Sequence, residues 1–503
     1  MQVAHQRAQL SFAVRLQQRL GEGLSDGGTN ARDDRAMTIV VIDDDPTGSQ
    51  TVHSCPLLLR WDVDSLRRGL RHRSSLLFVL ANTRALPPEE AAQRNREIVD
   101  ALQQALEAEA IRESELLLVS RGDSTLRGHG VLEPAVLAEE LEARFGPVDA
   151  TLHVPAFLPG GRTTVDGVHL LHGEPVHTTA FARDRSFGFS TSALDAWLEE
   201  KSAGTIPAHS VLRLGRDLLD RAVDEVPEGG EALLDWLLAL RGNAPVVVDA
   251  ECPAQLDALG VAVHRLQGRK RFLFRAAASL INGLVNAGKT SLGPQPLSAA
   301  GLASLRRRDS MGVALPGLVL VGSHVPLADV QLAELLTDDR CAGLELPVAR
   351  IARVLEGGTP DLLLADLECE WGEHLQSCLA RRRTPVLFTS RGELTFGDGA
   401  SSQRRRLQFG LELAQLTARL VAALAPQLGY VISKGGITTG TLLAEGLDLE
   451  AVQLEGQLLP GLSLVRPLVP RGLPWDGLPI VTFPGNLGDA STLAEAWRLM
   501  ESG

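Results

Sequence analysis

A short apolar run near residue 40 ends in a cluster of acidic side chains. Asp43, Asp44 and Asp45 follow the run TIVVI and precede Pro-Thr-Gly. A carboxylate at the end of a strand can accept the proton of a substrate hydroxyl or hold Mg²⁺. Helix capping and turn formation use the same residue types, so the pattern indicates either a catalytic loop or an ordinary turn.

A second polar motif, RGDSTLRG at 121–128, places Asp123 and Arg127 on either side of two hydroxyl side chains. These residues suit the binding of a polyhydroxy acid, because a guanidinium can donate two parallel hydrogen bonds to a carboxylate. An internal ion pair between the two residues is the alternative. Arg84 and Arg162 also follow apolar runs. We therefore expect three arginines and two acidic sites to converge on one pocket.

Three glycine-rich turns in the C-terminal half are typical of phosphate binding: VGSH at 321–324, SKGGITTG at 433–440 and FPGNLG at 483–488. Glycine lets backbone N–H groups approach phosphate oxygens, and a helix that starts after the turn favours negative charge. We expect that helix to start at the paired threonines of the second turn. Lys434 could reach a phosphate or pair with a surface carboxylate, and we favour the surface position. Two such turns in one domain predict a site for a nucleoside triphosphate.

The segment from Gly283 to Thr290 matches the P-loop pattern G-x-x-x-x-G-K-[ST] letter for letter. The pattern binds phosphate only when it connects a strand to a helix. Here Gly283 falls inside RAAASLINGLVNAG, which we interpret as a helix, and the Gly and Pro residues after Thr290 prevent a second helix. We interpret the match as chance and keep a P-loop kinase or NTPase that uses Lys289 as an alternative hypothesis.

Histidine and cysteine do not form a metal-site pattern. His169, His172 and His177 lie in a segment typical of a hairpin with HGEP as its turn, where alternation places the first two on opposite faces. The five cysteines form no CxxC pair, which argues against structural zinc and favours a reducing compartment. We therefore expect no metal held by protein ligands and a cytoplasmic location.

Length and composition indicate a soluble globular chain with more than one core. The chain has 503 residues, of which 44% are hydrophobic and 22% charged, and this length favours two domains. A net charge of −13 argues against nucleic acid as a partner. The apolar runs are far shorter than the ~20 residues of a membrane-spanning helix, so no membrane partner is expected. The first 36 residues have no apolar periodicity, and we expect them to be loosely ordered and dispensable.

The elements that position these motifs alternate in type. Apolar runs at 38, 76, 115 and 150 end in polar residues, and stretches rich in Ala, Leu and Glu lie between them. Such alternation predicts a mostly parallel sheet covered on both faces, with ligands at the carboxyl ends of its strands. A second alternation begins at 318, so we predict an α/β fold of two domains, each with a mostly parallel sheet flanked by helices, and an active site in the cleft between them. The predicted divisions are an N-terminal extension (1–36), a first domain (37–295), a linker (296–315) and a second domain (316–503).

Seven blocks in order make the chain resemble the four-carbon acid sugar kinase family. They are DDPTG (44–48), NTRAL (82–86), GDSTLRG (122–128), PAFLPGGRTTVDGVH (155–169), VGSHVP (321–326), KGGITTG (434–440) and FPGNLGDA (483–490). The resemblance implies an N-terminal sugar-acid-binding domain and a C-terminal nucleotide-binding domain. It also implies transfer of the ATP γ-phosphoryl group to a terminal hydroxyl of 3-oxo-tetronate, threonate, erythronate or a similar short sugar acid. Pro46, Arg121 and the FPGNLG block depart from common family forms and leave the substrate open.

The resemblance also suggests roles for individual residues. Asp44 or Asp123 would orient or deprotonate the substrate hydroxyl. The expected substrate-binding residues are Asp45, Arg84, Ser124, Arg127 and Arg162. The expected nucleotide-binding residues are Ser323, Gly435, Gly436, Ile437, Thr438, Gly485 and Asn486. The expected cofactors are ATP and Mg²⁺, the expected partners are these small molecules and a second copy in a homodimer, and a sugar-acid sensor without catalysis is the alternative outside the enzymes.

Overall fold

The computed structural model describes residues 37–46, 48, 51–184, 186–225, 230–287, 297–355, 360–391 and 400–502. The predicted extension at 1–36 and Lys289 lie outside these residues. The chain divides into two compact units, and the division is discontinuous in sequence. The first unit is Met1–Asp44, Asp62–Leu77 and Pro88–Gly293, and the second is Asp45–Trp61, Phe78–Pro87 and Pro294–Gly503.

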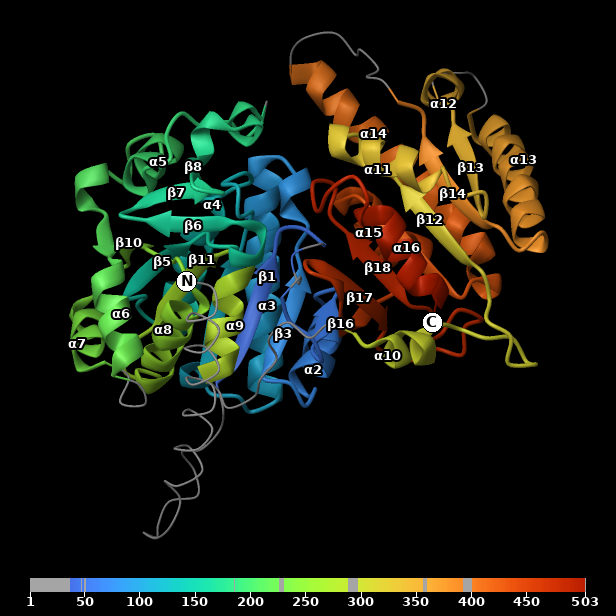
Figure 1. The fold of residues 1–503 in the computed structure, drawn as a ribbon. Helices are drawn as coiled ribbons and strands as arrows, with labels where there is room; N and C mark the ends of the chain where they lie inside the picture. The colour runs from blue at the N-terminus through green and yellow to red at the C-terminus, as the bar shows by residue number, and fades with distance from the viewer. Residues whose placement is uncertain are drawn as a thin grey trace. The chain divides into compact units, whose positions relative to one another are not determined.

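The first unit is built on a parallel sheet (Figure 1). Its strands, in spatial order, are β1 (Thr38–Asp43), β4 (Leu116–Arg121), β11 (Phe272–Ala276), β5 (Ala150–Val154), β10 (Ala244–Val248) and β9 (Leu212–Leu214). Nearly all of the residues in the first four of these strands are buried, as in a sheet covered on both faces. A separate small antiparallel sheet contains β6 (Arg162–Val165), β7 (Val168–Leu171) and β8 (Glu174–Pro175).

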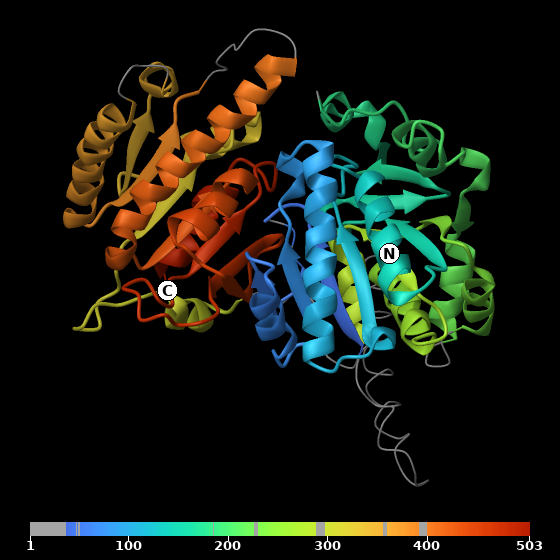
Figure 2. The same cartoon turned by 180° about the vertical axis from the view of Figure 1, so that it is seen from behind.

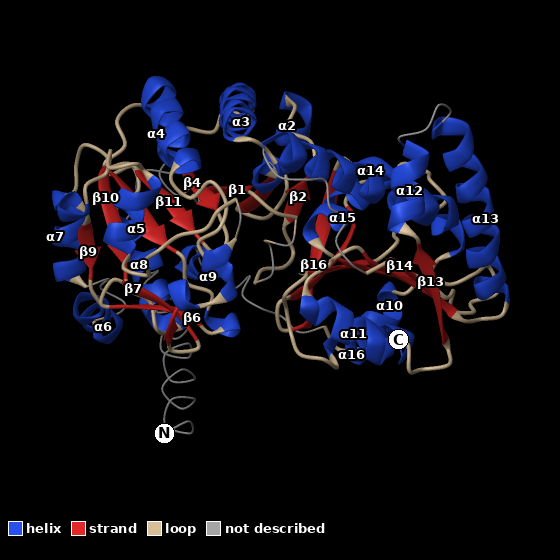
Figure 3. Cartoon of the chain, turned by 90° about the horizontal axis from the view of Figure 1, so that it is seen from above, coloured by secondary structure: helices blue, strands red, loops and turns tan. Residues whose placement is uncertain are grey.

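Helices cover both faces of this sheet (Figure 3). One layer contains α2 (Val63–Leu70), α3 (Pro88–Ala108) and α4 (Leu132–Phe145), and the other contains α6 (Arg216–Asp224), α8 (Pro253–Arg265) and α9 (Ala278–Ala287). Helix α3 turns Ile98, Val99, Leu102 and Leu106 inward, and this spacing of three to four residues makes one apolar stripe. Two more helices, α5 (Leu194–Lys201) and α7 (Glu231–Ala239), complete the unit.

The second unit has a mixed sheet. Its strands, in spatial order, are β13 (Cys341–Leu346), β14 (Thr384–Thr389), β12 (Gly317–Val321), β15 (Tyr430–Lys434), β18 (Ile480–Phe483), β17 (Leu462–Pro467), β16 (Ala451–Leu459) and β2 (Pro56–Leu58). The first five are parallel, whereas β17 and β16 pair in antiparallel fashion. The segment just before α2 therefore contributes its strand, β2, to the second unit.

Helices again form two layers in this unit. One layer contains α10 (Ala299–Leu305), α11 (Pro326–Leu335) and α16 (Thr492–Ser502), and the other contains α12 (Val348–Leu355), α13 (Pro360–Ala380), α14 (Ala400–Leu424) and the short α15 (Gly436–Thr441). The long orange helix α14 is seen clearly from behind (Figure 2). No helix within the described ranges combines the length and apolarity needed to cross a membrane.

The predicted fold class is confirmed, since both units are α/β with mostly parallel strands between helices. The expected hairpin is also present: His172 and Gly173 form the turn between β7 and β8, and both have positive φ. The boundaries of the second unit differ from the single linker expected at 296–315. Strand β2 pairs with β16, which comes much later in the sequence, and the end of β3 (Leu76–Leu80) pairs with β2. Apolar periodicity carries no information about such long-range pairing.

Candidate functional site

The carboxyl ends of three adjacent strands, β12, β15 and β18, form a glycine-lined cradle in the second unit. The chain turns at Ser323 after β12, at Gly435 after β15 and at Gly485 after β18. Backbone hydrogen bonds fix these turns to one another: the Ser323 N–H donates to the Lys434 carbonyl (3.2 Å), and the Gly435 N–H donates to the Phe483 carbonyl (2.9 Å). The three glycine-rich turns predicted from the sequence therefore meet in one place.

The turns of the cradle approach one another closely, and glycines allow this approach. Gly435 has φ +122°, and a Cβ there would lie 3.2 Å from the Ser323 nitrogen. A Cβ on Gly485 would lie 2.5 Å from Ser323 Oγ. Thr438 Oγ1 is 3.4 Å from the Cβ position of Gly435. This arrangement of small residues and hydroxyls is suited to a bound phosphate, because backbone N–H groups and hydroxyls donate to its oxygens.

Other expected nucleotide residues lie on the same turns. Ile437 is 39% exposed at the start of α15, and Asn486 is half-buried after β18. The helix after the second turn starts at Gly436, so the expected start at Thr438 and Thr439 was wrong. The reason is that Gly435 alone, at a backbone angle that other residues avoid, turns the chain from the strand into the helix.

Gly436 is next to an acidic side chain. Its own φ is not in the left-handed region, and a Cβ there would lie 2.7 Å from Asp45 Oδ2. Asp45 accepts a hydrogen bond from Arg84 Nη1 at 3.1 Å. A side chain at Gly436 would therefore meet Asp45 without backbone strain, and the requirement for a left-handed backbone belongs to Gly435. The Asp45–Arg84 pair, expected among the sugar-acid residues, lies in the second unit beside this glycine.

Lys434 is not at the surface, so the favoured prediction for this residue was wrong. The side chain is fully buried, its Nζ donates to the Pro484 carbonyl (3.0 Å), and it lies 3.8 Å from the centre of the Phe483 ring. Burial lowers the pKa of Lys434 to about 7. One sequence signal for the burial of Lys434 was available, since this residue ends the mostly apolar strand β15. That strand lies between two other strands.

We expect this lysine to make stability depend on pH in the protein without ligands. Its pKa falls from 10.5 in the unfolded chain to about 7 in the fold, so between pH 7 and pH 9 the unfolded state binds more protons. The free energy of unfolding should then rise with pH, by about 2 kcal/mol relative to Lys434→Met. Urea unfolding of both proteins at pH 7 and pH 9 measures this difference, and parallel pH profiles would contradict it.

A buried ionic cluster occupies the carboxyl ends of β1, β4 and β11 in the first unit. Asp44 is 2% exposed, and its carboxylate lies 3.5 Å from Arg121 Nη1 and 3.8 Å from Arg275 Nη2. Arg121 Nη1 is also 3.3 Å from Asp43 Oδ1, and Arg275 Nη1 donates to Glu133 Oε2 at 2.5 Å. Removing the charge of one residue in this cluster would leave an oppositely charged, buried neighbour without compensation.

Sequence reasoning missed two members of this cluster. Arg275 and Glu133 are 231 and 89 positions from Asp44, and only the strand order β1-β4-β11 and the packing of α4 bring them together. One signal was available for Arg275, since it interrupts the apolar sequence FLFRAAA. Glu133 carried no comparable signal, because acidic residues are common in the first turn of a helix.

Asp123 and Arg127 form the internal pair that was one of the two hypotheses. Arg127 Nε donates to Asp123 Oδ2 at 2.7 Å, and the Thr125 hydroxyl donates to the same oxygen at 2.5 Å. Arg162 is close enough for its pKa to be affected by Asp123 and Arg127, although burial has the largest effect and lowers it. Arg162 Nη1 donates to the Gly160 carbonyl (2.8 Å). Asp123, Arg127 and Arg162 thus lie near one another, whereas Arg84, expected in the same pocket, pairs with Asp45 in the second unit.

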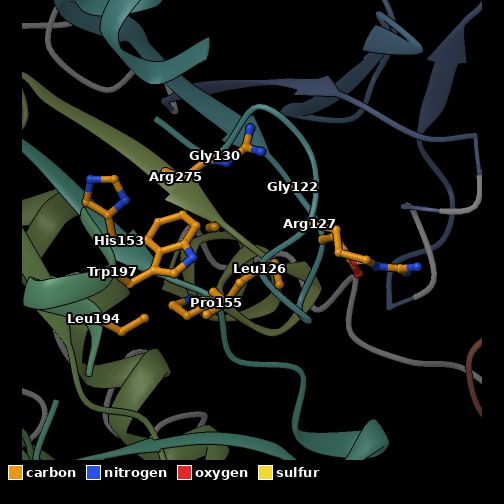
Figure 4. A pocket seen from close by; sticks show the side chains of 12 residues that line it. Gly122, Leu126, Arg127, Gly130, His153, Pro155, Leu194, Trp197 and Arg275 are labelled. Carbon is orange, nitrogen blue, oxygen red and sulfur yellow. Dashed lines mark hydrogen bonds and ion pairs between the residues drawn. The ribbon is translucent and has the colours of Figure 1, made fainter. Parts of the chain in front are cut away.

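A pocket opens behind the loop that carries this pair. It is a small pocket, with a cavity volume of about 20 Å³. Its lining includes Asp123, Arg127, His153, Trp197 and Arg275. Burial, with a smaller effect of Arg275, lowers the pKa of His153 to about 3, so this ring is neutral. Figure 4 shows Arg127 extending away from the apolar side chains of the pocket.

His169 and Ser124 tie the neighbouring hairpin to this loop. His169 is buried, its Nε2 donates to the Ser124 carbonyl (2.7 Å), and its Nδ1 is 3.0 Å from the Thr164 hydroxyl. Burial lowers its pKa to about 4. Both ring nitrogens thus have protein partners, and His169 acts as a structural residue that holds the backbone of Ser124.

Two family models match the chain. The model of a sugar-binding N-terminal domain matches residues 39–284, and the model of a nucleotide-binding C-terminal domain matches residues 318–493. A chain with these two domains and polar strand ends in each belongs to the class of sugar-acid kinases. More narrowly, this chain belongs to the four-carbon acid sugar kinase family, as its motifs predicted.

Named relatives are kinases. A D-threonate kinase from Salmonella typhimurium is 26% identical over 479 residues, which cover 92% of this chain and 99% of the relative. A D-erythronate kinase from Heliobacterium modesticaldum is 27% identical over 310 residues, 58% of this chain and 59% of the relative. The similarity supports an enzyme of the sugar-acid kinase type rather than a sensor without catalysis.

Solved structures support the fold. A Salmonella typhimurium LT2 protein aligns with a TM-score of 0.60 at 18% identity, covering 92% of this chain and 98% of the other. A Haemophilus influenzae protein aligns with a TM-score of 0.54 at 16% identity, covering 92% of this chain and 100% of the other. At these identities the likeness concerns the fold alone.

Proposed function

We propose that this protein transfers the γ-phosphoryl group of ATP to a terminal hydroxyl of a four-carbon sugar acid. D-Threonate, D-erythronate and 3-oxo-tetronate are the proposed acceptors. The observation that carries the proposal is the cradle at the ends of β12, β15 and β18, where three glycine-rich turns meet beside the hydroxyl groups of Ser323 and Thr438. The arginine pair near Asp123 and the names of the relatives support the sugar acid.

The proposed mechanism relies on positioning and charge neutralisation, as phosphoryl transfer generally does. Ser323 and Thr438 bind the phosphates through their hydroxyl groups, Gly485 binds through its N–H group, and Gly435 allows the close approach of the turns. In the first unit, Arg127 and Arg162 bind the carboxylate of the acid. In this assignment the second unit binds the nucleotide and the first unit binds the sugar acid.

Asp123 is proposed as the residue that orients the acceptor hydroxyl and takes its proton. Its carboxylate lines the pocket and already accepts a hydroxyl hydrogen bond from Thr125. Asp44 is 2% exposed and lies close to Arg121 and Arg275. Its proposed role is to hold those two guanidinium groups in position. Asp123→Asn should then lower kcat with little change in either KM, whereas Asp44→Asn should also lower stability.

Magnesium is proposed to enter with ATP, because Mg²⁺ at such sites is bound largely by phosphate oxygens and water. When bound, it neutralises charge on the phosphates. The cradle offers the hydroxyl groups of Ser323 and Thr438 to the phosphates of such a complex. Among the described residues, no group of three or more His, Cys, Asp or Glu side chains is arranged to hold a metal ion.

The P-loop hypothesis is not favoured by the structure around Gly283. This residue lies inside α9, where a Cβ would overlap the Leu256 carbonyl of α8, and Gly260 of α8 packs equally closely on Gly283. The glycine therefore serves the contact between two helices. We expect Gly283→Ala to lower the melting temperature by several degrees without raising KM for ATP, and Lys289→Ala to retain turnover. Loss of turnover in Lys289→Ala with an unchanged melting curve would restore the P-loop hypothesis.

A coupled assay of ADP release tests the proposed function. Purified full-length protein is incubated with MgATP and each of D-threonate, D-erythronate and 3-oxo-tetronate, with the corresponding polyol lacking a carboxylate as the control. ADP release should depend on the acid and should be absent with the polyol. ADP release at the same rate without any acid would contradict a sugar-acid kinase.

A further inference from the structure

Lys434 carries a buried amine that the mechanism above does not use. It is the last residue of β15. The turn after β12 is bonded to its main chain, because the Gly322 and Ser323 N–H groups donate to the Lys434 carbonyl (3.0 and 3.2 Å). Its Nζ donates to the Pro484 carbonyl, directly before Gly485. The lysine thus links all three turns, through its main chain on one side and its side chain on the other.

The amine has no anionic partner. Among the described residues, no carboxylate lies within 4.0 Å of its nitrogen, and its other neighbour is the Phe483 ring, which suits a cation. A fully buried ammonium without a counter-charge is costly in an empty fold. An anion bound in the cradle directly above it would remove that cost.

Charged groups on the surrounding elements are engaged elsewhere. Asp45, beside Gly436, pairs with Arg84. Asp329 of α11 lies 3.1 Å from Arg391 Nε, and Arg391 Nη1 also donates to the Ser323 carbonyl. His324, next to the first turn, lies 3.0 Å from the Thr389 hydroxyl, and burial lowers its pKa. His324 is therefore a second titratable group near the cradle, with its pKa held below the usual value.

We propose that Lys434 is the positioning residue of the nucleotide site: it holds the Pro484–Gly485 turn against the other two turns, and binding of the phosphates is coupled to protonation of its amine. This inference rests on the proposed function, because it takes the cradle to be the ATP site. The lowered pKa of the free enzyme agrees with it, since the amine is only partly protonated near pH 7 until an anion arrives. Its pKa should rise when the phosphates bind.

Calorimetry of MgATP binding without sugar acid tests the coupling. Titrations of the full chain at pH 7.5 in HEPES, imidazole and Tris buffers should give apparent enthalpies that increase with the ionisation enthalpy of the buffer. The slope should correspond to uptake of roughly 0.5 to 0.8 proton, as expected for an amine whose pKa rises from about 7 to well above 7.5. In Lys434→Met the uptake should vanish and the affinity should fall roughly 10- to 100-fold.

Three variants keep the result interpretable. Lys201→Met is the matched control, because this lysine of α5 likewise donates to a carbonyl, that of Gly188 (2.9 Å), and should change neither affinity nor uptake. His324→Gln should retain the uptake, and its loss there would assign the proton to His324 and overturn the inference. Lys434→Arg, which stays charged, should bind MgATP better than Lys434→Met but without proton uptake.

Two results would overturn the inference alone: unchanged proton uptake in Lys434→Met, or MgATP binding by the wild type without proton uptake. No MgATP binding by the wild type would instead overturn the proposed function.

Discussion

Replacing Gly435 by valine should lower kcat/KM for ATP by about a thousandfold. A non-glycine residue at φ +122° costs about 1–3 kcal/mol in strain. Its side chain would also crowd the Ser323 nitrogen, 3.2 Å from the Cβ position, and Thr438 Oγ1, 3.4 Å from it. Displacing these two residues would weaken hydrogen bonds from their hydroxyl groups to an anion, each worth about 1.5–3 kcal/mol. Steady-state kinetics with varied ATP, together with calorimetric ATP binding, measure the loss.

A matched glycine separates strain from filling of the cradle. Gly472 also has positive φ (+71°), but a Cβ there would meet nothing within 4 Å. Gly472→Val should lower stability somewhat and leave KM for ATP unchanged. Gly485→Ala adds the converse case, because it fills space beside Ser323 Oγ without left-handed strain. If Gly435→Val kept its ATP affinity and lost affinity for the sugar acid, the roles of the two units would be the reverse of those proposed.

Replacing Arg127 by glutamine should raise KM for the sugar acid by about a hundredfold or more. The Arg127 guanidinium is held by Asp123 and Thr125 through its Nε, and it is only partly exposed. Two hydrogen bonds to a carboxylate, each worth about 1.5–3 kcal/mol, would be lost with it. KM for ATP should stay within a factor of about three, because the nucleotide residues lie in the other unit.

Arg216 provides the control in the same unit. It lies 3.6 Å from Glu251 in an exposed pair, and such pairs contribute about 0–1 kcal/mol. Arg216→Gln should therefore leave both KM values unchanged. Equal effects of the two substitutions on KM for the acid would mean that Arg127 is only the partner of Asp123, as the internal-pair hypothesis holds.

Local patterns predicted much of the fold and the position of both candidate sites. The strands at Thr38, Leu116, Ala150 and Gly317 were visible because short apolar runs that end abruptly in polar or glycine residues are typical of buried parallel strands. The sequence also allowed the three glycine-rich turns to be expected close together, since parallel strands place their carboxyl ends at one edge of a sheet.

Features that depend on long-range packing were not predictable from local patterns. Arg275 reaches Asp44 only because β11 lies next to β4, two positions from β1, and sequence does not reveal this strand order. Lys434 was expected at the surface because the resemblance assigned the function of its turn to the glycines, whereas two flanking strands and Phe483 enclose it. Strand β2 joins the C-terminal unit through pairing with β16, almost 400 residues away.

Phosphorus NMR of the complete reaction tests the central claim most directly. Full-length protein, MgATP and D-threonate or D-erythronate are followed until the γ-phosphorus signal of ATP has disappeared. The proposed function predicts a new phosphate-monoester signal split by two neighbouring protons, because the terminal hydroxyl is on a CH₂ group, and formation of ADP in equal amount. Inorganic phosphate as the sole new species, or no consumption of ATP with any four-carbon sugar acid including 3-oxo-tetronate, would contradict it.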